Sequence, residues 1–113
     1  MSTPRLKSGL WVKAQLRLCD LNFLSCVVVQ KGDEDAGQIL VKINNLSGHC
    51  RVLAERYDDG MEKMWAVVNS GDERAVDSYI AQESSFDPDL WVIEIEDPKG
   101  LYKPDGQSPQ CIF

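Results

Sequence analysis

Three apolar segments, joined only by short turn sequences, constrain the fold of this chain most. They are QILVKIN, HCRVLAERY and EKMWAVVN, and the turns NNLSG and DDG separate them. In the first segment Ile39, Val41 and Ile43 alternate with other residues, which is the period of a strand with one apolar face. DDG is typical of a hairpin turn because glycine accepts the positive φ that such turns need. The segments therefore predict an antiparallel meander.

The region before the meander predicts a helix and a further strand. The stretch GLWVKAQLRLCDL fits either a strand or a helical face, but its many helix formers and its single β-branched residue favour a helix. We expect this helix from about Ser8 to Asp20, with Ser8 as its N-cap. The valine run of LSCVVVQ then predicts a buried strand from Leu24 to Gln30.

The region after the meander predicts a second helix and a last strand. Ser70 and Glu73 have the spacing of a capping box, and apolar residues follow at helical spacing to about Ser84. Asp87-Pro88 ends this helix, since the residue before proline resists the helical region. LWVIEIED is the last strand. The order α-β-β-β-β-α-β predicts an α+β fold, with a five-stranded, mostly antiparallel sheet and both helices on one face.

Length and charge limit the domain organisation and the partners. The chain has 113 residues, which is enough for one domain. We expect this domain at 1–97 and a mobile tail at 98–113, where proline and glycine are frequent. The net charge of −6 disfavours binding to nucleic acid and to an anionic membrane. No segment has the length of an export signal or a membrane span, so we expect a cytoplasmic protein with reduced thiols.

Three segments together resemble a small alphaproteobacterial family of unknown function. They are RLKSGLWVKAQLRLC, KGDEDAGQILVKINNLSG and DPDLWVIEIED, of which the G-D-x-D-A-G loop and the last segment are the most specific. The resemblance extends from about Arg5 to Asp97 and leaves out the tail. It implies a bacterial protein of a single domain, and it brings no substrate, cofactor or catalytic residue.

The acidic loop KGDEDAG is the first candidate site. An EF-hand needs glycine at the sixth position and glutamate at the twelfth, and counting from Asp33 neither is present. Asp33 and Asp35 could hold a divalent ion weakly, but polar connections of this kind are mostly solvated turns.

A nuclease-like arrangement of Asp35 and Lys42 is the second candidate. It lacks an acid two residues before Lys42, where Leu40 stands.

A mixed apolar and charged face of the sheet is the third candidate. If the fourth strand turns Met64 toward the helices, Trp65 lies on the opposite face, together with Arg51, Lys42 and Leu53 of the neighbouring strands. Such a face resembles a protein-interaction surface, although a partly solvated sheet back is the commoner case. We therefore expect a non-enzymatic interaction module without a cofactor, binding a protein or itself. The alternative is an enzyme of unrecognised type or a degenerate nuclease-like domain using Asp33, Asp35 and Lys42.

Overall fold

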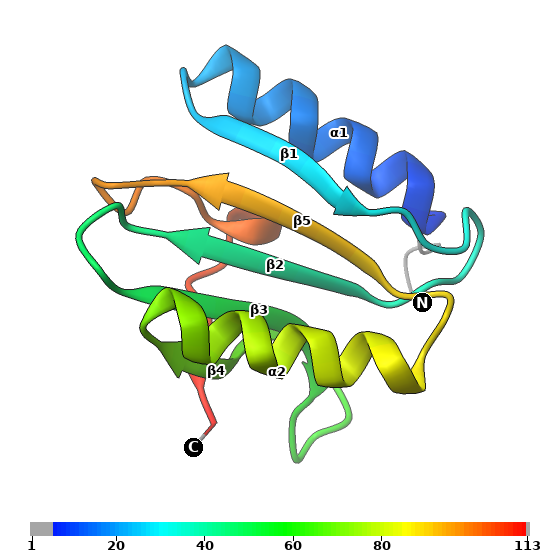
Figure 1. The fold of residues 1–113 in the computed structure, drawn as a ribbon. Helices are drawn as coiled ribbons and strands as arrows, with labels where there is room; N and C mark the ends of the chain where they lie inside the picture. The colour runs from blue at the N-terminus through cyan, green and yellow to red at the C-terminus, as the bar shows by residue number, and fades with distance from the viewer. Residues whose placement is uncertain (1–5, 113) are drawn as a thin grey trace.

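A computed structural model of the chain describes residues 6–112, in which six strands form one mixed sheet with a helix on each face (Figure 1). The strand order across the sheet is β1-β5-β2-β3-β4-β6. In chain order the elements are α1 (Ser8–Leu21), β1 (Ser25–Gln30), β2 (Ile39–Asn44), β3 (Cys50–Tyr57), β4 (Lys63–Gly71), α2 (Glu73–Phe86), β5 (Trp91–Glu96), the short 3-10 helix η1 (Pro104–Gly106) and β6 (Gln110–Cys111).

The meander is confirmed, whereas the strand count and the strand directions differ in part from the expectation. β2, β3 and β4 are neighbours and antiparallel, with Val41 opposite Leu53 and Leu53 opposite Val67. The last long strand, β5, lies between β1 and β2; it is antiparallel to β1 and parallel to β2. β6 adds a sixth strand, parallel to β4. The sheet is therefore mixed, and β5 occupies a central position.

The two helices cover opposite faces of the sheet, so the prediction that they share one face is wrong. Trp11 and Val12 of α1 belong to a core on one face, which includes Val41 and Ile93. Val76 of α2 belongs to a second core on the other face. The reason lies in β2 and β5, which begin with apolar residues on both of their faces. A strand of this kind needs cover on both sides.

Both helix starts lie close to their expected positions, but other groups cap them. The Ser8 Oγ does not cap α1; it donates to the Gly37 carbonyl at 2.5 Å, and Lys7 is the N-cap without a side-chain bond. α2 begins after Asp72, whose carboxylate accepts from the Ala75 N–H at 2.8 Å. The proposed cap Ser70 still belongs to β4. The side chain that caps α2 therefore belongs to Asp72, which is two residues nearer to the helix than Ser70, the cap predicted from the capping-box spacing.

The segment after Asp97 packs on the body, which does not fit the predicted mobile tail. The carboxylate of Asp97 is buried and accepts the N–H groups of Leu101 and Tyr102, each at 2.9 Å. The Tyr102 side chain enters the core, where its hydroxyl donates to Gln15 at 2.7 Å. Burial raises the pKa of Tyr102 well above its ordinary value. These contacts extend the folded body beyond Asp97, to β6.

Candidate functional site

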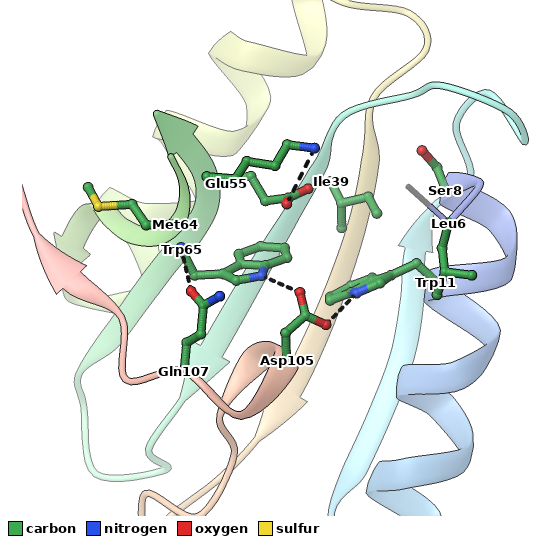
Figure 2. A pocket seen from close by; sticks show the side chains of 10 residues that line it. Leu6, Ser8, Trp11, Ile39, Glu55, Met64, Trp65, Asp105 and Gln107 are labelled. Atoms are coloured by element: carbon green, nitrogen blue, oxygen red, sulfur yellow. Dashed lines mark hydrogen bonds and ion pairs between the residues drawn. The ribbon is translucent and has the colours of Figure 1, made fainter. Parts of the chain in front are cut away.

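A pocket of about 530 Å³ lies between the start of α1, the sheet and the C-terminal segment (Figure 2). Elements far apart in the sequence contribute to it, because α1 covers the beginning of β2 and the segment around η1 returns to the same place. Its walls combine apolar and charged side chains: Leu6, Ser8, Trp11, Ile39, Glu55, Lys63, Met64, Trp65, Asp105 and Gln107. A pocket with an apolar wall and a few polar groups is typical of a binding site.

Two stacked tryptophans and one carboxylate organise this pocket. The rings of Trp11 and Trp65 have centroids 5.0 Å apart and are inclined by 23°. Each indole N–H donates to one oxygen of Asp105, at 2.9 Å in both cases. Gln107 accepts from the backbone N–H of Trp65 at 3.2 Å. Asp105 and Gln107 thereby attach the C-terminal segment to both α1 and β4, as Figure 2 shows.

The predicted interaction face is not formed, because its residues lie on different faces and most are buried. Trp65 and Leu53 lie on the face that α1 covers, with exposed fractions of 1% and 0%. Arg51, opposite Ile43, shares that face and is half-buried. Lys42 is buried on the other face, toward α2. The alternation within each strand was correctly recognised, but the register between the strands decides which residues share a face.

Lys42 is the centre of a charged cluster beneath the start of α2. Its ammonium group lies 2.7 Å from Glu73, 2.7 Å from Asp77 and 3.3 Å from Glu94. Burial alone would lower the pKa of Lys42, but the hydrogen bonds to Asp77 and Glu73 outweigh it, and the charge of Glu94 adds to them, so this pKa is raised. The ammonium is therefore held charged as the neutralising partner of three acids. A lysine held in this way is a poor general base.

The acidic loop between β1 and β2 contacts the start of α1 and not the charged cluster around Lys42. The carbonyl groups of Glu34 and Asp35 accept the N–H groups of Gly9 and Ser8, at 2.9 and 3.4 Å. The carboxylate of Asp33 accepts from Asp35 and Ala36 within its own loop. None of these contacts reaches Lys42, so the structure does not bring together the three residues of the enzyme alternative.

Gly37 ends this loop where two backbone segments approach closely. A Cβ atom at Gly37 would lie 2.3 Å from the carbonyl oxygen of Asp89 and 2.9 Å from the nitrogen of Asp33. Gly32 approaches the same oxygen in the same way. Since backbone atoms cannot move aside as a side chain can, only glycine fits at these positions.

We expect Gly37→Ala to lower the free energy of unfolding by about 1–3 kcal/mol, the usual cost of forcing a methyl group into occupied space. Urea unfolding followed by circular dichroism measures this change. Glu34→Ala is the matched control in the same loop. Because the Glu34 side chain is exposed, its loss should change the stability by less than about 0.5 kcal/mol. Equal stabilities of the two variants would contradict the close approach at Gly37.

An exposed apolar surface on α1 is the feature that the sequence analysis missed. It consists of five leucines with exposed fractions between 49% and 61%, and we call it the leucine surface: Leu6, Leu10, Leu18, Leu21 and Leu101. Leu10, Leu18 and Leu21 follow one another at helical spacing on one side of α1, away from its buried residues. In the sequence these leucines fit the same helical face as Trp11, but in the structure Trp11 is buried and the leucines are exposed.

Each end of the leucine surface adjoins a hollow. Leu6 lines the pocket that contains Trp11 and Trp65, at the beginning of α1. At the other end, Leu18 and Leu101 line a smaller hollow of about 170 Å³ together with Tyr102 and Lys103. Large exposed apolar patches are uncommon on monomeric proteins and mark interaction sites. The surface and its two hollows form an elongated site along α1.

Comparison with known proteins places this fold in a family. The model of the family described as "Protein of unknown function (DUF1491)" matches residues 6–102. A crystal structure of a DUF1491 family protein from Caulobacter crescentus CB15 is 33% identical, covers 94% of this chain and 99% of that one, and has a TM-score of 0.80. None of the curated proteins compared with the chain is similar to it.

Two solution structures agree with this match. An NMR structure of a DUF1491 family protein from Caulobacter crescentus CB15 is 33% identical and has a TM-score of 0.77, with coverage of 96% of this chain and 98% of that one. Protein Atu0922 from A. tumefaciens is 27% identical, with a TM-score of 0.75 and coverage of 95% and 99%. The predicted resemblance to an alphaproteobacterial family of unknown function is confirmed. Among residues 6–112 no helix is long and apolar enough to span a membrane.

Proposed function

The chain belongs to the DUF1491 family, and because the function of that family is unknown, we propose one from the chain's own surface. It is a non-enzymatic, cytoplasmic interaction module that binds another protein through the leucine surface. The observation that carries this proposal is the exposure of Leu10, Leu18 and Leu21 on one side of a helix whose other side is fully engaged in the core. Exposing three leucines to water is unfavourable unless a partner covers them.

The charges around this surface favour an acidic partner segment. Lys13 and Arg17 are exposed on α1 beside the leucines, and Lys103 lines the smaller hollow. Among residues 6–112, none of these three cations is in an ion pair. The protein as a whole is acidic, so this basic margin is a local reversal of its charge. Opposite charges at the rim of an interface orient the partner and accelerate its association.

The geometry of α1 favours an amphipathic helix as the bound segment. Trp11 and Leu18, which line the two hollows, are two helical turns apart, or about 10 Å at the rise of an α-helix. A partner helix presents side chains at the same spacing when they are seven residues apart. We therefore propose an occupant with two such apolar anchors and with acidic residues on its flanks.

Capture from a lysate of the source cells with two matched variants tests this proposal. In Leu10→Glu/Leu18→Glu the leucine surface carries two charges. Leu46→Glu places one charge on a leucine that is 55% exposed on the loop between β2 and β3. The partner should be retained by the wild type and by Leu46→Glu. The double variant should lose it, with a dissociation constant raised by about thirtyfold or more, the loss expected of one central contact.

A synthetic peptide tests the chemistry of the partner. A helical peptide with leucines seven residues apart and glutamates on its flanks should bind in a fluorescence anisotropy titration, and it should shift the NMR signals of α1. The same peptide with lysines in place of the glutamates should bind at least about tenfold more weakly. A protein captured equally by the wild type and the double variant would refute the leucine surface as the site. Preferential binding of the basic peptide would refute an acidic partner.

A further inference from the structure

Two cysteine side chains meet where the end of α1 approaches the start of β1. Cys19 lies on the last turn of α1 with an exposed fraction of 1%, and Cys26 is the half-buried second residue of β1. Both are free thiols, and their side chains are hydrogen-bonded to each other. Since a disulfide needs its two cysteines side by side, a bond between these sulfurs requires little movement of either element.

The backbone holds the two cysteines in this position. The Cys19 carbonyl accepts the N–H groups of Asn22 at 3.1 Å and Leu24 at 2.8 Å, which joins the last turn of α1 to the residues just before β1. α1 lies along β1 (Figure 1), and Cys26, opposite Ile95, faces the same core as Cys19. The proximity of the two thiols therefore follows from the course of the backbone.

Cys26 is the member of the pair that a small molecule reaches first. It lines an open hollow beside the end of α1, together with Arg17 and Asp20. Cys19 is almost fully buried by comparison. The guanidinium group of Arg17 attracts carboxylates, so a small disulfide that carries carboxylate groups is favoured at this hollow.

We propose that Cys19 and Cys26 form a reversible dithiol–disulfide pair that exchanges with low-molecular-weight disulfides. The Cys26 thiolate attacks one sulfur of a disulfide RSSR, so that a mixed disulfide forms and RS⁻ leaves. The Cys19 thiolate then attacks the sulfur of Cys26, which closes the bridge and releases the second RS⁻. The two thiol protons pass to the leaving thiolates. Two protein thiols are thereby oxidised to one disulfide, and RSSR is reduced to two RSH.

Burial makes this exchange slow at neutral pH. Burial and the adjoining Cys19 thiol raise the pKa of Cys26 to about 12, and burial raises the pKa of Cys19 as well. The thiolate is the nucleophile, so the rate should rise about tenfold for each pH unit below that pKa. The pair therefore responds to a sustained excess of disulfide and not to a brief one.

The bridge fastens the last turn of α1 to β1. This turn carries Leu18 and Leu21, two members of the leucine surface. The redox state of the pair therefore determines how firmly this end of the leucine surface is held. The exchange itself does not depend on the partner proposed for that surface.

Equilibration of the full chain with glutathione and glutathione disulfide tests the proposal, at about pH 9, where exchange is faster. Every sample carries Cys111→Ser, because Cys111 is exposed and can itself react with the disulfide. After acid quenching and alkylation, trypsin releases the peptide 18–31, which contains Cys19 and Cys26 and no other cysteine. The loss of two hydrogen atoms from this peptide, measured by mass spectrometry, reports the bridge. The folded chain should form it at an excess of disulfide at least about tenfold lower than the chain in urea, because folding holds the sulfurs together.

Two further measurements complete the test. In Cys26→Ala the peptide 18–31 of the folded chain should stay reduced, because Cys19 is buried; a glutathione adduct on Cys19 would refute the order of attack. Hydrogen exchange at the amides of Asn22 and Leu24 should slow in the bridged form, and an unchanged rate would refute the effect on α1. A folded chain that stays reduced, or stops at a glutathione adduct, under conditions that bridge the chain in urea would overturn the proposal.

Discussion

Trp65→Ala is expected to lower the free energy of unfolding by about 3–5 kcal/mol, the range for removing a buried aromatic side chain. Trp65 has an exposed fraction of 1% and stacks on Trp11. Its loss also leaves Asp105 with one indole donor instead of two. Such a loss is a large part of the total stability of a small domain. Urea unfolding followed by far-ultraviolet circular dichroism measures it without relying on tryptophan fluorescence.

Two further variants separate the causes of this effect. Trp65→Phe keeps a smaller aromatic ring in the core and removes the indole N–H together with the second ring, so its cost should be smaller than that of the alanine variant. Phe86→Ala removes an aromatic side chain that is 78% exposed at the end of α2, and it should change the stability by less than about 0.5 kcal/mol. If Trp65→Ala were as mild as Phe86→Ala, Trp65 would not be a core residue.

Truncation after Pro98 is the second change with a large expected effect. It removes Tyr102 from the core and Asp105 from the two indoles, and we expect a loss of about 3 kcal/mol or more in the free energy of unfolding. The sequence alone had led us to expect a tail that the domain could lose with little consequence. The midpoint of urea unfolding of the two chain lengths decides between these expectations.

A shorter truncation is the matched control. A chain ending at Ser108 retains Tyr102, Asp105 and Gln107 and loses residues 109–113, which include the exposed strand β6. Its stability should remain within about 1 kcal/mol of the full chain, since exposed residues contribute little. If both truncations were equally harmful, the stabilising contacts would belong to β6 and not to the residues around η1.

Local patterns were sufficient for most of the elements. The first helix was predicted from Ser8 to about Asp20 by its helix formers, and it extends over Ser8–Leu21 in the structure. The meander was predicted from the alternation within its segments and the turns between them. These features depend on interactions between residues near one another in the chain. Gly37 is different, because the backbone that approaches it most closely belongs to Asp89, which is distant in the sequence.

The candidate site was not predictable in the same way, because its geometry depends on contacts between distant segments. Whether Lys42 and Leu53 share a face depends on the register of β2 and β3, which alternation within each strand leaves open. The burial of Trp65 depends on the return of Asp105 from a segment that appeared mobile by composition. The exposure of Leu18 depends on which side of α1 meets the sheet.

The sequence by itself determined the class of the fold, the helices and strands of the body, the antiparallel meander and the family to which the chain belongs. Those conclusions rest on local periodicity, on turn residues and on segments whose order of residues is specific. Only the tertiary structure decided that β5 lies between β1 and β2, that the helices cover opposite faces, and that the C-terminal segment completes the core. The physical reason is that burial is a property of the assembled sheet. An apolar run such as WVIEI can be covered on one face or on both, and only its neighbours in space settle which.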